Sequence, residues 1–212
     1  MSSYKVHYFP GYGKAEPIRM LLAHAKIEFE DVHYTPETLP AAKASGNLEF
    51  GQMPVLEKDG KFYSQSQAIL RFLGKELGYY PEDTYHGYLV DSTLDFINDL
   101  TNARFKANNH PEPETKKQLL ADFYEKVLSN FFLAIQKRLE ANSSPDKIVG
   151  DKVTIADIAL AAIAYSFFLN ENNLSKTEYQ EVLNKFPKVL DYFNGLGELL
   201  KEYLAARAPS PW

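Results

Sequence analysis

The stretch from Gly51 to Gly74, GQMPVLEKDGKFYSQSQAILRFLG, decides the fold of the first part of the chain. Two runs with strand character, 55–57 and 61–63, flank Asp59-Gly60. That pair is typical of a tight hairpin, so two antiparallel strands are predicted. Polar residues then lead into an apolar run at helical spacing, which predicts a helix over 66–77.

The residues before this stretch have a β-α-β pattern. Tyr4–Phe9 alternates as a strand does, Ala15–Ala25 carries apolar residues at helical spacing, and Glu28–Tyr34 is a second predicted strand. A looser helical segment follows near 38–45. Together with the hairpin, the predicted order is β-α-β-α-β-β-α, with a mixed four-stranded sheet of the thioredoxin-like type.

Strand patterns stop after Tyr79-Tyr80-Pro81-Glu82-Asp83, which interrupts all periodicity. The sequence therefore predicts two domains, a thioredoxin-like α/β domain over 1–80 and an all-α domain over 81–212. Helices of the second domain are predicted at 84–108, 113–140, 154–169, 176–184 and 188–205.

Composition excludes several classes of function. The 212 residues are 45% hydrophobic and 24% charged, and no apolar run is long enough to span a bilayer. The net charge of −5 offers no basic stripe for nucleic acid. The absence of cysteine removes disulfides, thiolate metal sites and cysteine nucleophiles. The N-terminus has no basic segment followed by an apolar one, so the cytoplasm is the expected location.

Two motifs that often mark a cofactor or metal site are weak here. Gly11 and Gly13 follow a strand and open a helix, as in a dinucleotide-binding loop, but Glu16 stands where the third glycine is needed. The five histidines show no metal-ligand spacing. The glycines are expected to turn the chain, and no metal or cofactor is predicted.

The segment around Pro54 and Ser66 favours a site for an extended peptide. Pro54 cannot donate to a sheet ladder, and a trans bond is the commoner state before proline. Gln65 and Ser66 lie at a helix start, where serine is an ordinary cap and free N–H groups also accept a carboxylate. In combination, an interrupted strand end beside an anion-accepting helix start predicts a dock for a peptide with a free carboxylate.

Two patterns in the second domain are expected to be structural. For the first of them, the alternative is a cationic group of a ligand or partner. Asp91, Asp95 and Asp99 share one face of a predicted helix and repel one another unless a cationic group neutralises them. Thr154 and Asp157 form a predicted capping box in front of an apolar helix, which indicates a folding element.

Four segments together carry a resemblance that covers nearly the whole chain: YKVHYFPGYGKAEPIRMLL, FGQMPVLEKDGKFYSQSQAILRFL, VDSTLDFINDL and IVGDKVTIADI. In this order they resemble the cytosolic glutathione transferases, and the sigma class with its sigma-like nematode enzymes is the most similar. The block QMPVL…SQS is the most specific part.

The resemblance implies how this site would bind glutathione, which is a co-substrate rather than a cofactor. Pro54 would follow a cis peptide bond, and the Met53 backbone would pair with the cysteinyl part of the tripeptide. Gln65 and Ser66 would hold the γ-glutamyl carboxylate at the helix start. The predicted dock thus acquires a specific ligand.

The resemblance further implies residues at both ends of glutathione and a homodimer. Lys43 and Gln52 would reach the glycyl end, while Asp99 of the neighbouring subunit would meet the γ-glutamyl amine. Leu39 departs from the family pattern, because many members have a tryptophan there near the glycyl carboxylate.

Tyr8 and Lys14 are the implied catalytic residues. Tyr8 would donate its hydroxyl to the sulfur, and Lys14 stands where sigma-class enzymes often carry an arginine beside the thiolate. A free thiol has a pKa near ~8.5, so the enzyme must stabilise the anion to use it as a nucleophile at neutral pH.

The implied reaction is conjugation of glutathione to hydrophobic electrophiles, a detoxification chemistry. Glutathione-dependent prostaglandin D isomerisation is the alternative activity, and a crystallin-like structural protein or a ligand carrier is the alternative of another class. The electrophile pocket would be formed by Phe9, Tyr12, Arg104, Phe105 and Trp212.

Overall fold

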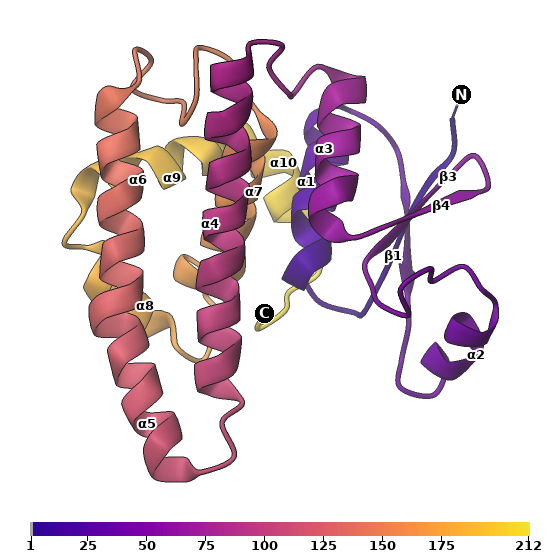
Figure 1. Ribbon diagram of the computed structural model, residues 1–212, viewed down its shortest axis with the longest axis horizontal. Coiled ribbons are helices and arrows are strands. Elements are labelled where there is room, and N and C mark those ends of the chain that lie inside the picture. Colours follow the sequence, from indigo (N-terminus) through magenta and orange to yellow (C-terminus); the bar gives the residue numbers. More distant parts are fainter. Residues whose placement is uncertain (1) are drawn as a thin grey trace.

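The computed structural model describes residues 2–212 and places the four strands of the first half in one mixed sheet (Figure 1). The order is β2-β1-β3-β4, with β1 parallel to β2 and antiparallel to β3, and β3 antiparallel to β4. The strands are β1 (Tyr4–Tyr8), β2 (Glu30–His33), β3 (Val55–Lys58) and β4 (Lys61–Ser64). The predicted thioredoxin-like fold of this half is confirmed.

Two helices cover the sheet on the side that faces the second half of the molecule, α1 (Glu16–His24) and α3 (Ser66–Leu77). They bury Ile18, Leu22 and Leu73 completely. Short α2 (Leu39–Ala44) buries no residue and lies away from this layer (Figure 1). The layer of α1 and α3 therefore joins the sheet to the helical half.

The second half is helical, as predicted. Its elements are α4 (Thr84–Asn108), α5 (Pro113–Asp122), η2 (Phe123–Leu128), α6 (Ser129–Ala141), α7 (Ile155–Ile163), η3 (Ala164–Phe168), α8 (Lys176–Leu183), α9 (Pro187–Leu199) and α10 (Lys201–Ala206). No helix within residues 2–212 combines the length and the apolarity that a membrane crossing requires.

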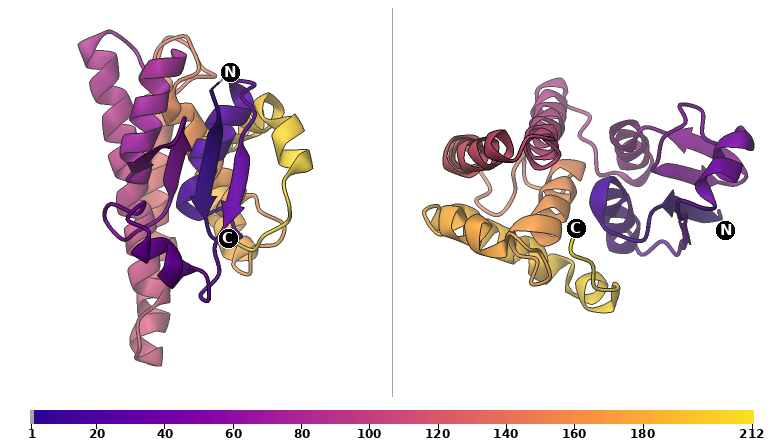
Figure 2. Two further views of the ribbon diagram at one scale, coloured as in Figure 1. Left: turned by 90° about the vertical axis from the view of Figure 1, so that its right-hand side faces the viewer. Right: turned by 90° about the horizontal axis from the view of Figure 1, so that it is seen from below.

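Helix α7 is the centre of this half and packs against both α1 and α4 (Figure 2). Every one of its residues is buried. The predicted capping box is present: the Thr154 Oγ1 accepts from the Ala156 N–H, and the Asp157 Oδ2 accepts from the Thr154 N–H at 2.8 Å. Asp157 Oδ1 also accepts from Ile148 N–H and from the Tyr192 hydroxyl. One carboxylate thus ties three segments together.

Three predicted helices differ in detail from the structure. The segments predicted at 113–140 and 154–169 are continuous, but each contains a π-helical stretch, η2 and η3. The helix predicted at 188–205 is interrupted at Leu200, which has φ −109° and ψ 11°. Its side chain is buried there, so packing of this residue into the core accompanies the break.

Candidate functional site

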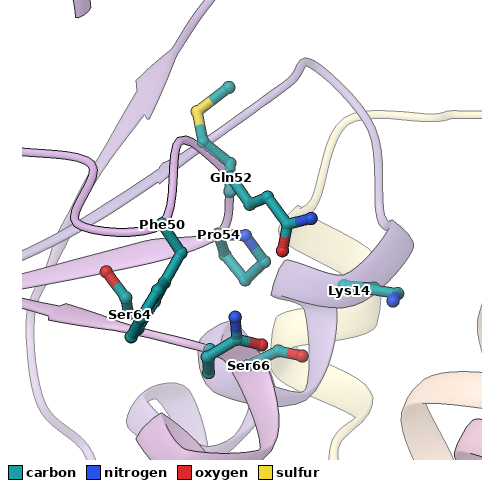
Figure 3. A pocket seen from close by; sticks show the side chains of 8 residues that line it. Lys14, Phe50, Gln52, Pro54, Ser64 and Ser66 are labelled. Carbon is teal, nitrogen blue, oxygen red and sulfur yellow. The ribbon is translucent and has the colours of Figure 1, made fainter. Parts of the chain in front are cut away.

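A small hollow lies where the open end of the β3–β4 hairpin, opposite its turn, meets the start of α3 (Figure 3). The peptide bond between Met53 and Pro54 is cis. The hollow is lined by Lys14, Phe50, Gln52, Met53, Pro54, Ser64, Gln65 and Ser66. Five of the eight residues predicted to bind glutathione are therefore brought together here, and Lys14 joins them.

The start of α3 is open toward this hollow. Gln65 occupies the N-cap position with φ 71°, and its side chain makes no capping hydrogen bond. Ser66 is the first helical residue, so it is not the cap that the simpler interpretation expected. First-turn N–H groups have no partner within their own helix and favour an anion. The Ser64 hydroxyl is also buried without a hydrogen-bond partner among residues 2–212.

Tyr8, at the end of β1, has its hydroxyl fixed by the loop that follows. The backbone N–H of Lys14 donates to the Tyr8 oxygen at 3.2 Å. Gly13 adopts φ +46°, and a Cβ atom at this position would lie 2.6 Å from the same oxygen. The hydroxyl oxygen thus accepts one hydrogen bond from the chain, and its own proton can be donated to a ligand.

A larger cavity of about 740 Å³ opens beside the hollow, within the range of ligand sites. Tyr8, Lys14 and Ser66 line the cavity, and the last two also line the hollow. The walls come mainly from α4, α7 and η3, with Tyr179 from α8. A ligand in the hollow and a second one in the cavity would therefore meet near Tyr8.

Three of the five residues predicted for the electrophile pocket line this cavity: Arg104, Phe105 and Trp212. The other two do not. Phe9 packs edge-on against Tyr8 at 5.4 Å between ring centroids. The Tyr12 hydroxyl donates to Ala208 and accepts from the Ser210 N–H, so it holds the C-terminal segment instead.

Lys43 and Asp99 are exposed and line neither space. The acidic face of α4 is partly neutralised by Arg71 of α3, which contacts Asp91 at 2.6 Å and Asp95 at 3.2 Å. Asp99, one turn further along, has no ion-pair partner within residues 2–212. The predicted role of Asp99 requires a second subunit.

Sequence reasoning missed several lining residues, including Phe50, Ser64 and Ser166. Ser64 is the last residue of β4, two positions before the predicted helix start at Ser66, and that spacing could have placed it near the site. Nothing local marks Ser166, since it lies in a mostly apolar helical run. No cluster of three or more metal-ligating side chains occurs in the described part of the chain.

Comparison with known protein families identifies the family of this chain. Residues 4–75 match the N-terminal domain of glutathione S-transferases, and residues 98–207 match the C-terminal domain. The chain belongs to the glutathione S-transferase family. A glutathione S-transferase of Anopheles gambiae is 32% identical over 98% of both chains.

Other glutathione S-transferases agree with this assignment. The mouse glutathione S-transferase A3 is 34% identical over 76% of this chain and 72% of its own. A Nu-class enzyme from Haemonchus contortus has a TM-score of 0.84 and 31% identity, with both chains covered completely. These relatives carry different designations within one family, so what they share with this chain is the family.

Proposed function

We propose that the chain binds glutathione in the hollow and holds its thiol as a thiolate that attacks hydrophobic electrophiles in the adjoining cavity. The observation that carries this proposal is the Tyr8 hydroxyl at the edge of the cavity, beside Lys14 and Ser66, which border both spaces. Its oxygen accepts from Lys14 N–H, which leaves its proton available for the sulfur. The electrophile would meet Arg104, Phe105 and Trp212.

The energy required is within reach of these groups. Lowering a thiol pKa from ~8.5 to about 6.5 needs about 2.7 kcal/mol of preferential stabilisation of the anion. One charge-assisted hydrogen bond from Tyr8, with the positive Lys14 side chain nearby, is sufficient for this. The reaction is direct attack by the bound thiolate, so no covalent enzyme intermediate forms.

The remaining contacts to glutathione follow from the hollow. The γ-glutamyl carboxylate would accept from the first turn of α3 at Gln65 and Ser66, and the Met53 backbone would pair with the cysteinyl unit. Gln52 would face the glycyl end, with exposed Lys43 reaching in from α2. We assign the protein to the sigma-like group, with a detoxifying role in the cytoplasm.

A homodimer completes this assignment. Tyr85, Tyr88, Asp95 and Asp99 follow one stripe of α4 by their spacing, and the two tyrosines are 64% and 61% exposed. Exposed aromatic side chains in a row are typical of an interface. Asp99 would then meet the γ-glutamyl amine bound by the other subunit.

Two measurements on the purified protein test the proposed function. We expect retention on immobilised glutathione and glutathione-dependent conjugation of an aryl halide. A crystallin-like or ligand-carrying protein would show no conjugation above the uncatalysed rate. Conjugation that is absent despite glutathione binding would contradict the proposal.

A further inference from the structure

The larger cavity carries an unusual balance of charge for an apolar space. Its charged lining residues are Lys14 and Arg104, and no aspartate or glutamate lines it. The chain as a whole has a net charge of −5, whereas the side chains around this cavity carry two positive charges and no negative one, so they make the local potential more positive. The cavity therefore favours an anionic ligand over a neutral one of the same shape.

Arg104 is held in place on one side and free on the other. Its Nε donates to the Tyr179 hydroxyl, and its guanidinium stacks over the Phe167 ring at 4.7 Å. Nη1 and Nη2 make no hydrogen bond or ion pair within residues 2–212. By contrast, Arg19 and Arg207 each contact a carboxylate. The two free donor groups of a fixed guanidinium match the two oxygens of a carboxylate.

The rest of the cavity fits an apolar body. Ile97 and Leu100 of α4 face the cavity together with Ala162 and Ile163 of the central helix α7. From Ile97 to Arg104 the wall extends seven residues, about 10 Å along a helix axis. A ligand with an apolar body of that length can reach Arg104 with one polar end.

An unpartnered hydroxyl in the same wall points independently to a ligand. Ser166 lines the cavity and is 2% exposed, and its Oγ makes no hydrogen bond within the described residues. It lies in the π-helical segment η3, immediately before Phe167, over which Arg104 stacks. Buried hydroxyls are normally bonded, so an ordered water or a polar atom of a bound molecule is the expected partner.

We propose that the cavity selects hydrophobic carboxylic acids, with the carboxylate on Nη1 and Nη2 of Arg104 and the apolar body between α4 and α7. This inference rests on the proposed function, because it names the class of electrophile that the cavity admits. Arg104 is a specificity-determining residue in this account, and it takes no part in activating the thiol.

The single tryptophan of the chain, Trp212, lines the cavity and supplies a direct readout of binding. The change in its fluorescence on binding is measured with dodecanoic acid and with its methyl ester, at neutral pH and without glutathione. The acid is then ionised, while the ester has the same body and no charge. We expect the acid to bind at least about tenfold more tightly, as a hydrogen-bonded charge allows.

Variants locate the preference at Arg104. Arg104→Gln should lower the affinity for the acid about tenfold and leave that for the ester within about twofold. Arg104→Lys keeps the positive charge but loses the pair of Nη donors, so its affinity for the acid should lie between those of Arg104→Gln and the wild type. Lys106→Gln is the matched control, because Lys106 is exposed on the same helix and does not line the cavity. It should bind both probes as the wild type does.

Several results would overturn the inference. These are equal affinity of the wild type for acid and ester, an equal loss of both in Arg104→Gln, or loss of the preference in Lys14→Gln alone. Failure of the proposed function gives a different pattern. A chain that prefers the acid but conjugates no aryl halide would contradict the transferase proposal only, and a conjugating chain without the preference would contradict this inference only.

Discussion

Gly13 sets the position of the Tyr8 hydroxyl, on which the proposed chemistry depends. Its φ of +46° is a conformation that side chains disfavour, and it places the backbone against the Tyr8 oxygen. The next N–H, from Lys14, then bonds that oxygen. A residue without a side chain therefore determines where the proton donor lies.

Gly13→Ala tests this placement. We expect conjugation to fall at least about tenfold, because the new Cβ would lie 2.6 Å from the Tyr8 oxygen and must displace it. Gly46→Ala is the matched control, because Gly46 also has a positive φ, of +81°, but a Cβ at this position would have no other atom within 4 Å. Steady-state rates at saturating glutathione compare the two. Equal losses in both variants would attribute the effect to backbone strain alone.

At the scale of single residues, the sequence predicted features that depend on neighbouring residues or on a family motif. The residue pattern alone favoured a trans bond before Pro54, and only the family resemblance implied the cis bond that is present. The helix start at Ser66 was predicted from the pattern and is present. The contact of Gly13 with Tyr8 was not predictable, because it depends on a backbone angle and on a residue five positions away. The free side of Arg104 depends likewise on Tyr179, which is 75 residues distant.

At the scale of the elements, α7 is held in place by hydrogen bonds to one buried carboxylate. Asp157 is fully buried and accepts hydrogen bonds from Thr154, Ile148 and Tyr192. These bonds fix the start of the helix that forms one wall of the cavity. The cap therefore links the stability of the helical half to the shape of the site.

Asp157→Ala should lower the free energy of unfolding by about 2–4 kcal/mol, because it leaves several buried donors without a partner. Urea denaturation, with a constant slope, measures this change. Asp151→Ala is the control, since Asp151 is exposed six residues earlier and makes no ion pair within residues 2–212. A loss below about 0.5 kcal/mol in Asp157→Ala would show that the cap contributes little.

Element boundaries were predictable where caps and breakers fix them. The helices over 66–77 and 84–108 have the predicted limits, because Gly78 closes the first and Asp83 caps the second. The π-helical segments and the break at Leu200 were not predicted. They accompany packing between helices distant in sequence, and no local pattern marks them.

On the scale of the whole molecule, the site exists only because the two halves pack together. The hollow belongs to the sheet half, while α4, α7 and η3 of the helical half supply most of the cavity. Sequence patterns predicted both halves and the order of elements. Which side chains converge on the cavity was predictable only in part, because that depends on how α1 packs against α7.

The proposed dimer predicts complementation between two impaired chains. Tyr8→Phe and Asp99→Ala are unfolded and refolded together, after Asp99→Ala alone is shown to be impaired. If Asp99 acts across the interface, each mixed dimer has one site with both defects and one intact site. About half the dimers are mixed, so roughly a quarter of all sites should regain wild-type activity.

The comparison is with the average activity of the two parents refolded separately. An increase above that average supports the shared site. Confirmed mixed dimers without any increase would place Asp99 in the site of its own chain, or outside the site altogether.

The central claim is that the Tyr8 hydroxyl stabilises the glutathione thiolate, and a pH titration of thiolate ultraviolet absorbance in the bound complex tests it most directly. Wild type should titrate near pH 6.5, about two units below the free thiol. Tyr8→Phe should move the midpoint most of the way back, since one lost donor to an anion costs about 2.7–4 kcal/mol. Ser66→Ala, the control, should weaken glutathione binding and leave the midpoint in place. An unchanged midpoint in Tyr8→Phe, or an equal shift in Ser66→Ala, would contradict the account.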